Sequence, residues 1–233
     1  MADWALLGEF AVYLVTLSIL AFHLASINPA RPFMPLFTTT GIALAASSTW
    51  FSQSWDSSHE SLITPWSDPL GNSAILFALA YMIADLPPLI CMHQLLPYER
   101  AMFVFHHVFC ALHLFCALYY GEYQKVAVLA LTAEISNIFL NGRKVVPQGG
   151  LVKQTADGIF ALTFLFYRLG YAVPMCVREC IYLFQQGRWF ELFVQHSGTV
   201  FVGALHIWWT YLVLDGIRVV IVPPKQASKA KTD

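Results

Sequence analysis

Charged residues are scarce in this sequence. Asp, Glu, Lys and Arg make up 12% of its 233 residues, whereas soluble domains carry about 25%. The hydrophobic share is 58% and the mean hydropathy is +0.59. We therefore expect an all-α, polytopic membrane protein with no soluble domain beside the bundle. The net charge of -1 and the lack of a continuous basic patch also argue against a nucleic-acid partner.

Other common signals are missing as well. The sequence has no CxxC pair, so it offers no framework for a disulfide or a metal site, and we expect its cysteines to be small buried hydrophobes. The first residues, MADW, lack the basic stretch of a cleavable signal peptide. The first apolar segment is therefore expected to stay as an anchor. The cysteines are Cys91, Cys110, Cys116, Cys176 and Cys180.

What the chain does have is a series of long apolar segments. Windows of about 20 apolar residues predict seven membrane-spanning helices. Pro87 and Pro88 are expected to kink or break the third helix after Asp85. The aromatic and polar residues of 178–197 suggest an interfacial segment. The predicted spans lie near 4–26, 33–51, 71–96, 101–120, 124–141, 155–178 and 198–222.

The charges of the predicted loops are distributed unevenly. With seven spans, most Lys and Arg residues fall on one side, and the other side receives only Lys125, Arg178 and Arg188. By the positive-inside rule, the C-terminus is cytosolic and the N-terminus is lumenal or extracellular. We expect residues 1–223 to form one membrane domain and 224–233 to form a disordered basic cytosolic tail.

The segment 101–120 carries three histidines at membrane depth. An α-helix turns 100° per residue, so His106, Cys110 and His113 share one face, with His107 beside them. Ionisable residues in a membrane span usually face a bundle interior or a wet cavity. We expect one of the adjacent histidines to face a cavity about 9 Å from the start of this segment, and the other to contact a neighbouring helix.

Further polar residues fall on other predicted spans. A single, partly hydrated cavity shared by these residues explains their positions more simply than several separate buried polar groups, each in its own helix. Two structural interpretations stay open: Glu134 and Arg168 form a buried ion pair that only fixes helix packing, and His206 only bonds one helix to another. The residues predicted to line the cavity are Tyr81, Cys110, His113, Asn137, Asn141, Arg168, Tyr171 and His206.

Histidines of this kind suit several chemistries. A neutral histidine can act as a general base or be acylated itself, and Glu134 or Asp85 would orient it. Diiron desaturases need many histidines in HxxxH and HxxHH spacings, and the eight histidines here form no such set in the predicted cytosolic loops. We therefore predict no metal and no bound cofactor. Haem ligation between His113 and His206 has no support beyond the presence of the two residues.

Four ordered motifs resemble the TLC-domain family, which includes ceramide synthases and several shorter relatives. They are Tyr81–Asp85, the pair His106-His107, Glu134–Arg143 and Phe164–Arg168. The resemblance extends over about the second to the last predicted span. The apolar run after His107 departs from the charged stretch of the synthases, so the chain looks closer to the shorter relatives.

The resemblance implies a barrel-like bundle of six or seven helices around a narrow lipid cavity. In ceramide synthases the paired histidines move a fatty acyl group from acyl-CoA to a sphingoid base. By analogy, His106 and His107 would be catalytic, with acyl-CoA as co-substrate. The resemblance also implies a role in membrane-lipid homeostasis, with the endoplasmic reticulum favoured over the plasma membrane.

Two other classes of function stay open. In the first, the chain is a non-enzymatic lipid sensor, regulator or cargo-binding protein whose polar cluster is structural. In the second, it is a pH-dependent transporter. The sequence does not define the acyl length, the acyl acceptor or the oligomeric state.

Overall fold

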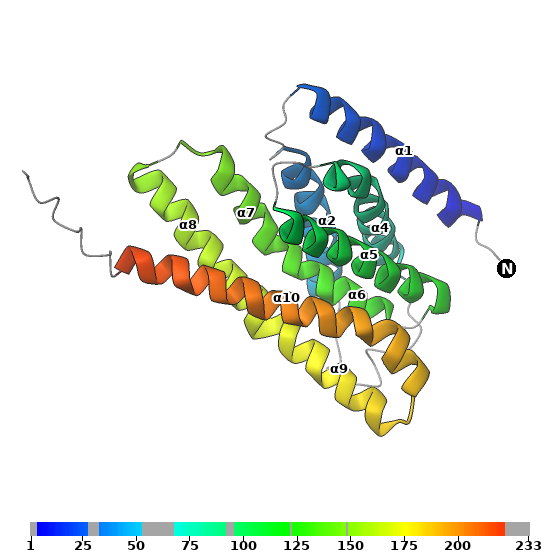
Figure 1. The fold of residues 1–233 in the computed structure, drawn as a ribbon. Helices are drawn as coiled ribbons and strands as arrows, with labels where there is room; N and C mark the ends of the chain where they lie inside the picture. The colour runs from blue at the N-terminus through cyan, green and yellow to red at the C-terminus, as the bar shows by residue number, and fades with distance from the viewer. Residues whose placement is uncertain are drawn as a thin grey trace, which may run out of the picture.

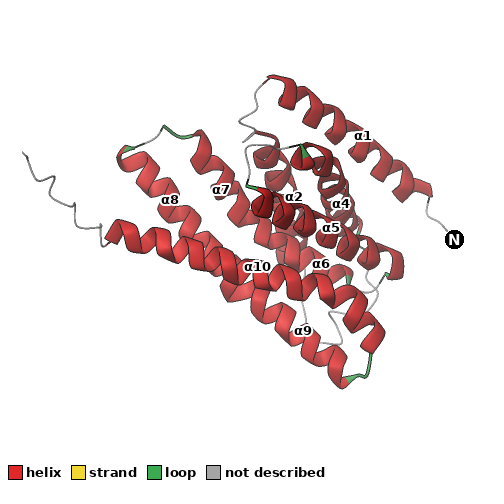
Figure 2. Ribbon diagram, in the orientation of Figure 1, coloured by secondary structure: helices red, strands yellow, loops and turns green. Residues whose placement is uncertain are grey.

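The computed structural model describes residues 4–27, 33–52, 68–91, 96–121, 123–147 and 149–221. The described residues form helices joined by short turns, and they contain no strand (Figure 2). The predicted tail, residues 224–233, lies outside the described part of the chain.

Seven helical stretches make up the described chain. Two of them are composite rods in which a short segment of different helical geometry joins two α-helices. The elements are α1 (Trp4–Ile27), α2 (Phe33–Ser52), α4 (Pro69–Ile90), α5 (Pro97–Tyr120), the rod of α6 (Gln124–Leu131), η1 (Thr132–Glu134) and α7 (Ile135–Val145), the rod of α8 (Gly150–Phe164), η2 (Leu165–Ala172) and α9 (Val173–Gln185), and α10 (Trp189–Ile221).

Six of the described stretches form a closed ring. In order around the ring, α2 contacts α4, α4 contacts α5, α5 contacts α10, α10 contacts α9, α8 contacts α7, and the rod of α6 and α7 returns to α2. Helix α1 packs mainly on the outside of α4, and Figure 1 shows it at the edge of the bundle. This arrangement confirms the predicted all-α, barrel-like bundle.

The outer surface of the ring is apolar. On α5, large side chains that are 43 to 54% exposed recur every three or four residues: Phe105, Val108, Leu112 and Phe115. This spacing places them on one helix face, and an exposed apolar surface of this kind is typical of contact with lipid. In the described chain, four stretches are long and apolar enough to cross a membrane: Pro69–Ile90, Pro97–Tyr120, Gly150–Gln185 and Val200–Arg218. The chain is a multi-pass membrane protein.

Caps set two helix starts that differ from the predicted ones. Asp68 accepts a hydrogen bond from the Gly71 N–H at 2.6 Å, so α4 begins at Pro69. Glu99 accepts from the Leu96 N–H at 3.1 Å, so α5 begins at Pro97 rather than near residue 101. His106 therefore lies about 14 Å from the start of its helix at 1.5 Å per residue, deeper than predicted.

Two segments that the sequence singled out, the prolines of the third predicted span and residues 178–197, are largely helical; the interfacial position of 178–197 stays a prediction. Helix α4 runs without a break to Ile90 and contains Pro87 and Pro88, so the predicted break after Asp85 is wrong, while a kink there stays a prediction. The predicted interfacial segment 178–197 is helical except for a tight turn. Gly187, at φ 68°, makes this turn between α9 and α10.

Two departures from α-helical geometry lie against one another inside the ring. The η1 segment is a 3-10 helix, and the hydroxyls of Thr132 and Ser136 donate to the carbonyls of Leu129 and Ala133 at 2.6 and 2.8 Å. Such bonds compete with regular helical pairing. The facing η2 segment is a π-helix, a rare form that often occurs at functional sites. These two segments carry Glu134 and Arg168.

Candidate functional site

Arg168 is the centre of a buried polar cluster. Its side chain is only 2% exposed, and a buried cation is tolerated only when its donors are satisfied. Nε donates to Ser136 Oγ at 2.9 Å, Nη1 to His206 Nε2 at 2.7 Å and Nη2 to Asn137 Oδ1 at 2.9 Å. One guanidinium thus connects η2, α7 and α10.

Glu134 supplies the opposite charge. Its Oε1 lies 3.6 Å from Arg168 Nη2, and the two side chains are 11% and 3% exposed. Its other oxygen accepts from Asn137 Nδ2 at 2.6 Å. The ion pair between Glu134 and Arg168, one of the interpretations of the sequence, is therefore present. Asn137 is hydrogen-bonded to both residues.

His206 takes part in this cluster as an acceptor. A guanidinium has only donors, so Nε2 of His206 must accept and the ring proton lies on Nδ1. The ring of Trp209 lies beside Arg168 and two histidines. Its centroid is 5.6 Å from Arg168 Cζ, 6.0 Å from the centroid of the His206 ring and 5.5 Å from that of the His106 ring. A cation this close to an indole is stabilised by the ring.

The adjacent histidines of α5 face different surroundings. His107 donates from Nδ1 to the Phe103 carbonyl at 2.9 Å. Its Nε2 lies 3.2 Å from Asp85 Oδ2 on α4, although the contact lacks hydrogen-bond geometry. His106 points inward, and its Nδ1 lies 3.6 Å from Cys110 Sγ. One histidine thus faces the interior, and the other faces α4.

A mostly apolar cavity borders the cluster. Its volume is about 90 Å³, which is above the minimum needed to hold water. The cavity lies between α4, α5, the α6–η1 segment, η2, α9 and α10. Its wall includes six polar or ionisable side chains: His106, Cys110, His113, Glu134, Arg168 and His206.

The apolar part of the cavity extends from this polar end in one direction. The wall continues along α5 to Leu114, along α6 to Val126, into α9 at Met175 and along α10 to Val202. The eight-residue interval from His106 to Leu114 corresponds to about 12 Å of helix. The site is therefore a narrow, mostly apolar slot with the charged groups at one end and His113 about 10 Å farther along α5.

Several residues predicted for the site lie outside the cavity wall. Asp85, His107 and Tyr81 form a separate group between α4 and α5, with the Tyr81 and His107 rings 6.1 Å apart. Asn141 lies two turns beyond Glu134, where it accepts from Lys144 Nζ at 3.3 Å.

The remaining two predicted cavity residues lie on the rods that carry the ion pair. Asn137 reaches the cavity only through Glu134 and Arg168. Tyr171 would share a face with Arg168 in an α-helix, but the wider turn of the π-helix places Ala172 on the wall instead.

Two residues of the cluster were not predicted. Ser136 contributes the acceptor for Arg168 Nε, and its position beside Asn137 was the available signal. Trp209 lies one turn after His206 on α10, so helical spacing could have placed it on the same face. Within the described ranges, no three His, Cys, Asp or Glu side chains are placed to hold a metal ion.

The comparison with known families decides the assignment. The profile of the TLC domain matches residues 33–215, which is more than half of the chain. The chain belongs to the TLC-domain family. No curated protein and no solved structure matches the chain significantly, and the closer likeness to the shorter family members stays a prediction.

The extent of the match agrees with the architecture. The TLC domain begins at the start of α2 and ends near the end of α10, so it contains the whole six-membered ring. Helix α1, which packs outside the ring, also lies outside the matched residues. The polar cluster and the cavity therefore belong to the TLC domain itself, and α1 is an addition to it.

Proposed function

We propose that this TLC-domain protein binds a fatty acyl chain or a sphingolipid-like molecule in the cavity and acts in membrane-lipid homeostasis. The observation that carries the proposal is the shape and polarity of the cavity. Its apolar slot accepts an alkyl chain by burial of apolar surface, while Glu134 and Arg168 at its end meet a polar head. The interior of the ring thus has the two chemical environments that an amphipathic lipid needs.

Arg168 supports a specific contact with the ligand. A guanidinium has five N–H groups, and three of them donate to Ser136, His206 and Asn137 among the described residues. Arg168 also lines the cavity, so we propose that a further N–H of its guanidinium donates to an oxygen of the ligand. A carbonyl, hydroxyl or ester oxygen of the ligand can accept this hydrogen bond from Arg168.

The test is to identify lipids that remain bound after purification in mild detergent, by native mass spectrometry. Ala130 lines the cavity, so Ala130→Phe should fill the slot and remove the bound lipid. Leu112→Phe makes a matched change on the lipid-facing side of α5 and should leave it in place. A wild-type protein free of acyl ligand, or equal lipid content in the two variants, would refute the proposal.

Acyl transfer from acyl-CoA is a second candidate, favoured by the position of His106 on the cavity wall. His106 lines the cavity whereas His107 lies outside it, bonded to the Phe103 carbonyl and facing Asp85, so we propose His106 as the base and His107 as a positioning residue. His106→Gln should then abolish transfer from acyl-CoA to an amine, and His107→Gln should only weaken it. If no acceptor turns over in the lipid-bound wild type, the protein is a non-enzymatic sensor, regulator or carrier.

The orientation in the membrane follows from the same proposal. Arg143, Lys144 and Lys153 lie at the connection of α7 and α8, so we place this end in the cytosol, where acyl-CoA is available. The C-terminus is then cytosolic and the endoplasmic reticulum is the proposed location. Cysteine-accessibility labelling of single-cysteine variants in sealed vesicles tests this orientation.

A further inference from the structure

Two side chains at the polar end of the cavity form a nucleophile and base pair. Cys110 Sγ lies 3.6 Å from Nδ1 and 3.9 Å from Nε2 of His106, one helical turn away on α5. Both residues line the cavity, together with Arg168. Binding an acyl chain does not require a thiol at this position, but transferring one can use it, because a thiolate is a strong nucleophile when a base is within reach.

We propose that Cys110 accepts the acyl group of an acyl-CoA and holds it as a thioester. The inference rests on the proposed function, since the acyl chain must enter the same cavity. It adds to that function a covalent intermediate and names the atom that carries it.

The step balances with acyl-CoA as the only co-reactant. His106 removes the proton from the Cys110 thiol, and Sγ attacks the carbonyl carbon of the acyl-CoA thioester. The new C–Sγ bond forms, the bond between the carbonyl carbon and the CoA sulfur breaks, and the proton on His106 returns to the leaving CoA thiolate. Arg168 lines the same cavity, and its guanidinium would donate to the oxyanion that forms after Sγ attacks and before the CoA thiolate leaves.

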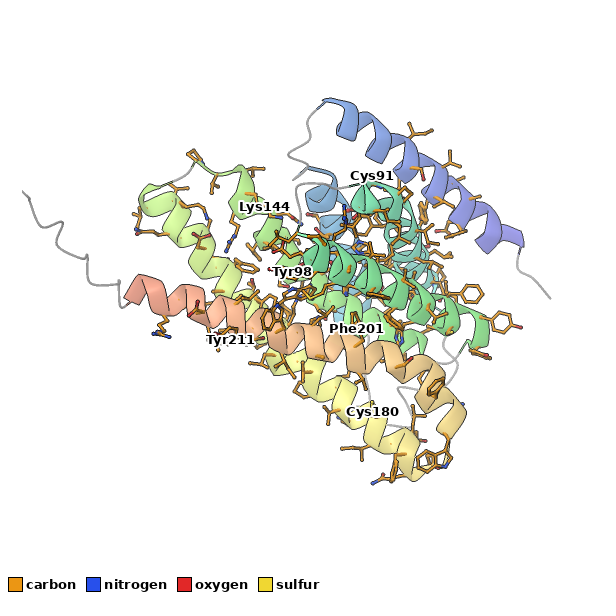
Figure 3. All side chains as sticks on the ribbon, in the orientation of Figure 1. Cys91, Tyr98, Lys144, Cys180, Phe201 and Tyr211 are labelled. Carbon is orange, nitrogen blue, oxygen red and sulfur yellow. The ribbon has the colours of Figure 1, made fainter. Side chains whose placement is uncertain are left out.

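Three other cysteines have side chains that the structure describes, and none of the three lines the cavity. Cys116 is buried on α5, but six residues from Cys110 turn it about 120° away, and it does not line the cavity. Cys91 lies exposed at the end of α4, and Cys180 lies on α9 (Figure 3). Of the cysteines whose side chains the structure describes, Cys110 is the one that shares the cavity wall with a histidine.

The experiment is to incubate the purified full-length protein with an alkyne-tagged long-chain acyl-CoA and to map the modified peptide by mass spectrometry. The wild type should carry a label on Cys110 that hydroxylamine removes, as expected of a thioester. Cys110→Ser should lose the hydroxylamine-sensitive label, whereas Cys116→Ser should keep it. His106→Gln should slow labelling about 100-fold, the lower end of the range for general-base catalysis.

The outcomes separate this inference from the proposed function. A wild type that retains bound lipid but acquires no label on Cys110 overturns the thioester and leaves lipid binding intact. Labelling confined to Cys91 or Cys180, or labelling of Cys110 at the same rate in His106→Gln, shows spontaneous acylation and also overturns it. Absence of both bound lipid and label means that the proposed function itself is wrong. Bound lipid measured on each variant shows whether it is folded.

Discussion

Replacing Arg168 with methionine should destabilise the protein by about 3 to 5 kcal/mol, the usual loss when one partner of a buried ion pair is removed. The change leaves Glu134 as a buried carboxylate, and it removes the donors for Ser136, Asn137 and His206. At about 0.6 kcal/mol for each hydrogen bond within a membrane bundle, the three bonds alone account for about 2 kcal/mol. The charge left on Glu134 supplies the rest.

The assay is reversible unfolding in mixed micelles of mild detergent and SDS, followed by tryptophan fluorescence. Arg143→Met is the matched control, because Arg143 lies 3.4 Å from Asp157 but the two side chains are 34% and 42% exposed. An exposed pair contributes at most about 1 kcal/mol, so the control should stay close to the wild type.

A double-mutant cycle makes the reasoning refutable. Glu134→Gln removes the charge that Arg168 balances, so Arg168→Met combined with Glu134→Gln should be more stable than the two single effects predict, by about 1 to 3 kcal/mol. A loss below about 1 kcal/mol in Arg168→Met, or strict additivity in the double variant, would show that the cluster is not an energetic unit.

Three further predictions follow from local geometry. Asp85→Asn changes a contact to His107 that lies outside the cavity, so the amount of bound lipid should not change; loss of lipid would place Asp85 in the site. Gly121→Ala should destabilise by about 1 to 2 kcal/mol, since Gly121 has φ 68° at the end of α5. Gly142→Ala should stabilise the protein by up to about 1 kcal/mol, since Gly142 lies inside α7 with no atom within 4 Å of an added Cβ. Chemical denaturation of the two glycine variants measures whether the free energy of unfolding falls in Gly121→Ala and rises in Gly142→Ala.

The sequence alone was sufficient for the class of fold and for the face of α5 that lines the cavity. Long apolar windows predicted the helices because backbone groups in lipid must be paired within the segment. Helical periodicity placed His106, Cys110 and His113 on one face, and all three line the cavity. The same rule could not place Tyr171, because it assumes regular α-helical turns and η2 is a π-helix.

Only the tertiary structure decided which polar residues meet. Arg168 and Ser136 are 32 residues apart, and Arg168 and His206 are 38 residues apart, so their contacts depend on how three helices pack rather than on any local pattern. Packing also decided which of the adjacent histidines faces the cavity, which is His106, and which faces Asp85 on α4, which is His107. Apolar content and periodicity are properties of one helix and can be read from its residues. A binding site between helices is set by their neighbours in space, and the order of the ring is fixed only when the helices pack.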